Sequence, residues 1–90
     1  MLSIFRTTQF KKDYKKLNTQ HQNLTKDIIS QLILQKALQP KHKDHKLIGN
    51  FKGYREYHIK PDLLLIYKID NNILELVLMR IGSHSELFKK

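Results

Sequence analysis

The sequence predicts an α+β domain with the element order β-α-α-β-β-β, in which a helical hairpin packs on an antiparallel sheet. Three observations predict this fold. Two segments with helical periodicity come early in the chain, and three strand-like segments follow them with no further helix between them. The chain has 90 residues, a length at which one small core forms, and 40% of them are hydrophobic. We therefore expect residues 1–90 to form a single domain.

A short strand followed by a helix is expected at the start of the chain. The segment LSIFR (residues 2–6) alternates sufficiently for a strand. Thr7 and Thr8 then supply hydroxyl side chains that suit a helix N-cap. The next apolar side chains recur at the spacing of one helical face: Phe10, Tyr14 and Leu17.

A second helix is expected from Thr19, because Thr19 and Gln22 have the spacing of a capping box. Its apolar side chains again share one face: Leu24, Ile28, Ile29, Leu32 and Ile33. Pro40 is expected to end this helix, since proline cannot continue a helical hydrogen-bond ladder. The two helices are expected to pack as a hairpin.

The sheet is expected in the second half of the chain, after a polar and basic loop at residues 41–53. Three strand candidates follow one another: YREYHIK, DLLLIYKI and ILELVLMR. The middle segment is apolar on both faces, which is typical of a central strand covered on both sides. The residues DNN (70–72) form a hairpin turn between the last two strands. The first strand of the chain lies at an edge or pairs into this sheet.

The charge of the chain favours an anionic partner. There are 17 Lys and Arg against 8 Asp and Glu, which gives a net charge of +9. Nucleic acid is the commonest partner of so basic a domain, and the alternative is a basic surface without such a partner. The candidate contacts are Lys11, Lys12, Lys15, Lys16, Lys52 and Arg55.

Several classes of protein are excluded. The chain has no cysteine, so it forms no disulfide, thiolate nucleophile or zinc–thiolate site. Its longest apolar run, residues 63–67, is far shorter than the ~20 residues that span a bilayer. No charged and then apolar leader opens the chain. We expect a cytoplasmic protein with no membrane partner.

A polar cluster is expected where the strand ends meet. Because side chains alternate along a strand, Glu56 and His58 share one face, which is a poor core face. Asp62 begins the next strand and Arg80 ends the last one, so tight antiparallel pairing places these ends side by side.

The tail after Arg80 is expected to emerge beside this turn. It carries His84 behind the flexible Gly82, and then the aromatic Phe88. His45, from the basic loop, can join the same group.

This group of side chains suits cleavage of RNA by its own 2′-hydroxyl. The reaction needs a base for the 2′-hydroxyl proton and an acid for the leaving 5′-oxygen, and histidine serves both roles near neutral pH. An arginine can stabilise the charge on the phosphorane, an aspartate can orient an imidazole or act as base, and an aromatic ring can stack on an unpaired base.

Each residue of this group can instead have a purely structural role. Asp62 can simply hold the turn, Arg80 can pair with Glu56 or Glu75, and Phe88 can cover the core. A metal site at the histidines is disfavoured, because lysines surround His42 and His45 and no regular helix is expected there. We expect no metal and no cofactor.

Three ordered motifs give the chain a family resemblance. KDHKLIG, YREYHIKPDLLLIY and RIGSHSELF resemble the motifs of the YafQ-type toxins, within the RelE/ParE superfamily of toxin–antitoxin systems. The resemblance covers residues 43–88 closely. It implies a RelE-like toxin domain that is a ribosome-dependent endoribonuclease, cuts mRNA and arrests translation. It also implies an antitoxin that is acidic or has an acidic segment, and contact with operator DNA only through the toxin–antitoxin complex.

The resemblance also implies roles for individual residues. The functional histidine of the first motif falls on His45, and the next motif places its histidine and aspartate on His58 and Asp62. The terminal motif places a histidine on His84 and an aromatic on Phe88. We add Arg80 to the catalytic set, and Lys52, Arg55 and Glu56 to the substrate-binding set.

The chain departs from the family pattern at two positions within these motifs. Glu56 stands where some relatives have aspartate, and Lys46 where many have proline. Two other functions stay open: a toxin of the same fold that acts on a protein such as DNA gyrase, and a non-catalytic RNA-binding module. Neither of them needs the set of His45, His58, Asp62 and His84.

Overall fold

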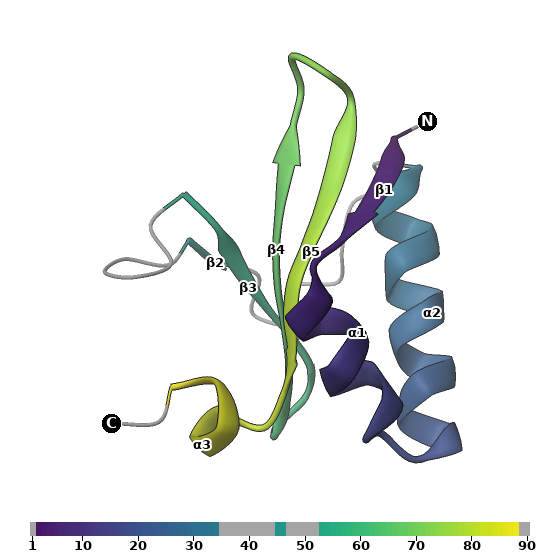
Figure 1. The fold of residues 1–90 in the computed structure, drawn as a ribbon, viewed down its shortest axis with the longest axis vertical. Helices are drawn as coiled ribbons and strands as arrows, with labels where there is room; N and C mark the ends of the chain where they lie inside the picture. The colour runs from purple at the N-terminus through teal and green to yellow at the C-terminus, as the bar shows by residue number, and fades with distance from the viewer. Residues whose placement is uncertain (1, 35–44, 47–52, 89–90) are drawn as a thin grey trace.

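One mixed sheet of five strands is the frame of the structure, a computed structural model that describes residues 2–34, 45–46 and 53–88. The strands lie in the order β1-β5-β4-β3-β2 (Figure 1). β1 pairs with β5 in parallel, and the other neighbouring pairs are antiparallel. Their bounds are β1 Ser3–Arg6, β2 His45–Lys46, β3 Arg55–Lys60, β4 Leu63–Asp70 and β5 Glu75–Gly82. The predicted meander is β3-β4-β5, and β1 takes one edge.

Two helices form the predicted hairpin and a third ends the described chain. They are α1 Thr8–Lys15, α2 Thr19–Ile33 and α3 His84–Leu87. The Tyr14 hydroxyl donates to the carbonyl of Gln22 at 3.2 Å, and the Gln22 side chain donates to the carbonyl of Tyr14 at 3.0 Å. These reciprocal bonds join α1 to α2. Both helices lie on one side of the sheet, and α3 lies on the other (Figure 1).

The helix ends confirm one sequence prediction and correct one. Thr7 is the N-cap of α1, and its hydroxyl also donates to the carbonyl of Met79 at 2.7 Å, which ties the helix to β5. The N-cap of α2 is Asn18, not Thr19, because the Asn18 backbone is extended and its side chain accepts from the His21 amide. α2 ends at Ile33, whose carbonyl accepts a hydrogen bond from the Leu2 amide. Pro40, which was expected to end this helix, lies outside the described residues.

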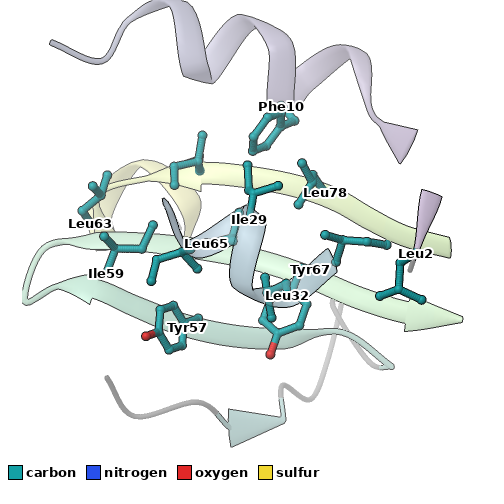
Figure 2. Packing of buried hydrophobic residues seen from close by; sticks show 13 residues of the cluster. Leu2, Phe10, Ile29, Leu32, Tyr57, Ile59, Leu63, Leu65, Tyr67 and Leu78 are labelled. Carbon is teal, nitrogen blue, oxygen red and sulfur yellow. The ribbon is translucent and has the colours of Figure 1, made fainter. Parts of the chain in front are cut away.

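The central strand β4 has an apolar layer on each face, as its sequence predicts. Leu63, Leu65 and Tyr67 pack toward α1 and α2 with side chains from β3 and β5 (Figure 2). Leu64 and Ile66 face the other way and pack with Leu87 of α3. The sheet therefore separates the helical hairpin from the C-terminal segment. Within the described part of the chain, no helix has the length and apolar character needed to span a membrane.

Candidate active site at the C-terminal segment

The C-terminal segment folds back as the short helix α3, held by a capping box. The Ser83 side chain accepts from the Glu86 amide at 3.3 Å, and the Glu86 carboxylate accepts from the Ser83 amide at 2.9 Å. The hydrogen bond from the Ser83 amide to the carboxylate, with a further contribution from the Ser83 side chain, holds the pKa of Glu86 below its ordinary value. Leu87 is buried against Leu64, so the segment is a packed end of the domain that also presents polar side chains.

Asp62 links this segment to the turn between β3 and β4. Its carboxylate accepts a hydrogen bond from the His84 backbone amide at 3.1 Å. The start of β4 and the end of β5 are paired here, because Leu64 lies opposite Gly82. The predicted position of the tail beside the Asp62 turn is confirmed by this hydrogen bond.

His84 and Phe88 share the outer surface of α3. Their ring centroids are 5.0 Å apart at an interplanar angle of 46°. The His84 side chain is exposed, whereas Phe88 is half-buried against the small apolar layer of that face. The segment thus holds an imidazole in solvent next to an aromatic ring, an arrangement that can meet an RNA base and its phosphate.

His58 lies on the same face of the sheet, paired with a buried carboxylate. Its Nε2 is 2.7 Å from Oε1 of Glu56, and Glu56 is only 4% exposed. His58 is opposite Leu64, which in turn is opposite Gly82. Two inter-strand spacings therefore separate the backbone of His58 from that of Gly82, about 10 Å.

Arg80 is held by a residue that the sequence analysis did not single out. Its Nε and Nη2 each donate to the Asp13 carboxylate of α1 at 3.0 Å, and the Ile81 amide donates to the same carboxylate at 3.3 Å. The predicted alternatives, ion pairs with Glu56 or Glu75, are replaced by this pair. Asp13 is 7% exposed, so α1 places an almost buried carboxylate at the edge of β5.

The electrostatics of this pair follow from its geometry. Burial alone would raise the pKa of Asp13, but the hydrogen bonds from Arg80, Gln9 and the Ile81 amide outweigh burial and lower it. The same contact with Asp13 raises the pKa of Arg80. Both groups stay charged near neutral pH.

One rung of the sheet joins three of the predicted residues. Arg80 is opposite Ile66, Ile66 is opposite Glu56, and the backbone of His45 in β2 is opposite Glu56. This row is next to the one that contains His58 and Gly82. The structure therefore brings Asp62 and His84 into contact, pairs His58 with Glu56, and sets Arg80 and the backbone of His45 in the adjacent row.

Two predicted substrate contacts stand apart from this group. Arg55 lies opposite Tyr67, whose ring packs toward the helices, so Arg55 is on the other face of β3 from Glu56 and His58. Lys52 lies outside the described residues. Among the residues that the structure describes, no group of three His, Cys, Asp or Glu side chains is arranged to hold a metal ion.

One feature of the sequence could have identified Asp13 as a buried residue with a partner. Asp13 is the single acidic residue in the lysine-rich segment TQFKKDYKKL (residues 8–17). A lone acidic residue on an otherwise basic helix is a candidate for a buried ion pair, because a carboxylate that is buried is almost always paired.

Comparison with known proteins identifies the family. The family model described as a bacterial toxin of type II toxin–antitoxin systems, YafQ, matches residues 2–89. The mRNA interferase toxin YafQ of Escherichia coli K12 is 36% identical over 83 residues, which cover 89% of this chain and 88% of that protein.

Solved structures agree with this assignment. A metal-bound toxin from Helicobacter pylori superposes with a TM-score of 0.85 at 42% identity, over 98% of this chain and 100% of the other. The Escherichia coli DinJ–YafQ complex matches with a TM-score of 0.84 at 36% identity, over 98% and 99% of the two chains. The chain belongs to the YafQ family of toxins of bacterial type II toxin–antitoxin systems.

Proposed function

We propose that this toxin is an endoribonuclease that cleaves mRNA on the ribosome and thereby arrests translation. The relatives of 36% identity carry the name mRNA interferase, which supports RNA cleavage as the activity. The observation that carries the proposal is the hydrogen bond from the His84 amide to Asp62. It holds the exposed imidazole of His84 on the face of the sheet that also bears the His58–Glu56 pair.

The proposed chemistry is attack by the 2′-hydroxyl on the adjacent phosphorus. The 2′-oxygen forms a bond to phosphorus, the bond to the 5′-oxygen breaks, and a 2′,3′-cyclic phosphate results. One of the histidines His45, His58 and His84 takes the 2′-hydroxyl proton and another protonates the 5′-oxygen. Glu56 orients the His58 ring, and Asp62 positions the backbone that carries His84.

Arg80 is proposed to stabilise the phosphorane charge. Asp13 occupies its Nε and Nη2, and among the described residues its Nη1 has no hydrogen-bond partner, so that nitrogen can meet a phosphate oxygen. Phe88 is proposed to stack on a base of the mRNA. Lys52 is proposed to contact the RNA backbone, and so is Arg55, from the other face of β3.

The proposed partner is a cognate antitoxin that is acidic or carries an acidic segment. Relatives were crystallised as DinJ–YafQ toxin–antitoxin complexes, which supports a partner of this kind. The net charge of +9 supports an acidic contact surface on that partner. Operator DNA is proposed to be bound only through this complex.

The proposed cleavage needs no metal ion, since histidines supply both proton transfers. The metal in the crystal structure of the Helicobacter pylori toxin makes chelation a direct test of this point. Cleavage should persist in excess EDTA with the magnesium needed by ribosomes restored. Loss of cleavage that only a transition metal restores would contradict metal independence.

Replacement of His84 by alanine tests the function most directly. Purified toxin is mixed with programmed ribosomes, and mRNA ends are mapped by primer extension. We expect His84→Ala to lower the cleavage rate by about 10²–10⁴-fold, the usual contribution of a general acid or base. His21→Ala, a matched histidine outside the site, should cleave like the wild type. Cleavage by His84→Ala within about threefold of wild type would refute this role.

Expression of the toxin in growing cells tests the proposed target. Expression without an antitoxin should stop amino-acid incorporation. Unchanged incorporation after strong induction, or inhibited DNA supercoiling with translation intact, would contradict the proposed target.

A further inference from the structure

A tyrosine and a lysine lie side by side on the face of the sheet that α3 covers, outside the proposed catalytic group. The Nζ atom of Lys68 is 5.1 Å from the centroid of the Tyr54 ring. Tyr54 immediately precedes β3 and Lys68 belongs to β4, in the register that places Arg55 opposite Tyr67. We call these two residues the Tyr54–Lys68 pair. Neither of them takes part in the proposed proton transfers.

Alternation along β4 places the Tyr54–Lys68 pair on the same face as the proposed site. Lys68 follows Leu64 and Ile66 at steps of two residues, and both of those side chains pack with α3. The Tyr54 ring packs against the same small apolar layer, as does Phe88. The pair therefore borders the surface that carries Phe88, the ring that is proposed to stack on a base of the mRNA.

The Tyr54–Lys68 pair also lies a short way along the strands from the proposed catalytic side chains. Glu56 and Ile66 are opposite each other, two residues from Tyr54 and Lys68, and two residues of a strand span about 7 Å. His58 is four residues from Tyr54, about 13 Å along β3. An RNA strand that lies across His58 and continues along β3 therefore reaches the pair with a nucleotide close to the cleaved bond.

The side chains of the Tyr54–Lys68 pair can both turn to a nucleotide. Lys68 is half-buried, and among the residues that the structure describes it has no carboxylate partner. A cation over an aromatic ring at a partly exposed site contributes less than a base stacked on the same ring. Lys68 can thus exchange the ring for a phosphate, and the ring face that it leaves can receive a base. A partner that offered only carboxylates would leave the ring unused.

We propose that the Tyr54–Lys68 pair is a subsite for a nucleotide of the mRNA close to the cleaved bond. The Lys68 ammonium binds a backbone phosphate, and the Tyr54 ring stacks on the neighbouring base. Because every base has a π face, this stacking adds affinity without selecting a sequence. The inference rests on the proposed function in taking mRNA as the ligand.

The test is a titration of isotope-labelled toxin with hexaadenylate that is 2′-O-methylated throughout, followed by amide chemical shifts. The methyl groups block the 2′-hydroxyls, so the wild-type toxin binds this probe without cutting it. We expect saturable shifts at Tyr54 and Lys68 as well as at His58 and His84. Absence of shifts at Tyr54 and Lys68, whether or not other residues respond, would overturn the subsite.

Variants of Tyr54 test the stacking. Tyr54→Leu should weaken binding of the probe about tenfold, and Tyr54→Phe should restore it because the ring is kept. An abasic oligomer with the same number of phosphates separates stacking from a structural effect of leucine, since Tyr54→Leu should change its binding less than about twofold. Equal losses of affinity for the two oligomers would show that the ring does not stack on a base, and would overturn the proposal.

Variants of lysine test the phosphate contact. Lys68→Gln should reduce the slope of log affinity against log salt by about 0.7, the contribution of one phosphate contact to a single strand. Lys26→Gln, which removes an exposed lysine of α2 on the other side of the sheet, is the matched control and should leave the slope unchanged. Equal slopes for these two variants would overturn phosphate binding by Lys68.

Cleavage by the wild type is measured separately, on ribosomes with unmodified mRNA. A toxin that binds the probe at the Tyr54–Lys68 pair but cuts no mRNA would refute the proposed function and leave the subsite standing. A toxin that cuts mRNA while the pair does not respond to the probe would refute the subsite alone.

Discussion

Replacing Asp13 by asparagine should destabilise the protein by breaking the link between α1 and β5. In the wild type, the Asp13 carboxylate accepts from Nε and Nη2 of Arg80, from the Ile81 amide and from the Gln9 side chain. Asparagine keeps one acceptor oxygen and turns an amide donor toward the guanidinium. The substitution therefore removes the charge and at least one hydrogen bond to Arg80.

The magnitude follows from the burial of the two partners. Removing one partner of a fully buried ion pair costs about 3–5 kcal/mol, because the other charge is left without compensation. The Arg80 side chain is 24% exposed, so it regains part of its hydration. We expect a loss of about 2–3 kcal/mol in the free energy of unfolding at neutral pH. For a domain of this size, that corresponds to a decrease in Tm of roughly 10–20 °C.

The pH dependence gives the prediction a second readout. The pKa of Asp13 in the folded protein is below its ordinary value of 3.8, so its contribution to stability is complete above that value. The contribution is lost as the pH falls through the folded-state pKa. The stability difference between wild type and Asp13→Asn should therefore be constant near neutral pH and shrink below about pH 4.

Urea unfolding at several pH values measures both effects. Asp27→Asn, which removes an exposed carboxylate from α2, is the matched control and should change stability by less than about 0.5 kcal/mol. Combining Asp13→Asn with Arg80→Met gives the coupling energy of the pair. A loss below about 0.5 kcal/mol for Asp13→Asn, or a difference that does not shrink in acid, would refute the reasoning.

Three further predictions concern the site and its surroundings. Glu56→Gln should lower kcat roughly 10- to 100-fold in the ribosome cleavage assay, because a hydrogen bond to a charged group contributes about 1.5–3 kcal/mol. A kcat within threefold of the wild-type value would contradict the orienting role of Glu56. Leu87→Ala should lower the free energy of unfolding by about 2–3 kcal/mol in urea, since Leu87 is only 5% exposed and packs against Leu64 and Ile66. Leu34→Ala, at an exposed position, is the control and should be nearly neutral. Equal losses for the two variants would show that α3 is not packed. Ribosome binding should weaken steeply with salt, and neutralising a true contact among Lys11, Lys12, Lys15 and Lys16 should reduce the slope of log affinity against log salt by about one; a flat salt dependence would exclude this surface.

Local patterns in the sequence were sufficient for most of the fold. The run at residues 63–67 predicted a central strand, because a strand apolar on both faces needs cover on both sides, and β4 has it. Thr7 predicted the start of α1 through the reach of its hydroxyl to the helix backbone. The meander predicted that the Asp62 turn meets the tail, since the ends of paired strands are adjacent.

Other features depended on contacts that no local pattern encodes. The end of α2 at Ile33 involves a hydrogen bond from Leu2, which is distant in the sequence. The two-residue strand β2 is too short for a periodicity signal. Glu56 is on the face that alternation assigns to it, yet its burial beside His58 depends on the surrounding side chains.

The sequence by itself determined the order of β1, α1, α2, β3, β4 and β5, because each of these elements depends on spacing within a few residues. The set of candidate catalytic side chains came from the motifs that resemble the family together with the expected meeting of strand ends. Only the tertiary structure decided which of those side chains have partners. Asp13 and Arg80 are 67 positions apart, and they meet because α1 packs along the edge of β5 beyond the end of β1. A cavity lined by residues of β1, α1 and α2 likewise exists only where these three elements come together. Periodicity reports which way a side chain faces, whereas its partner is set by packing across the whole chain.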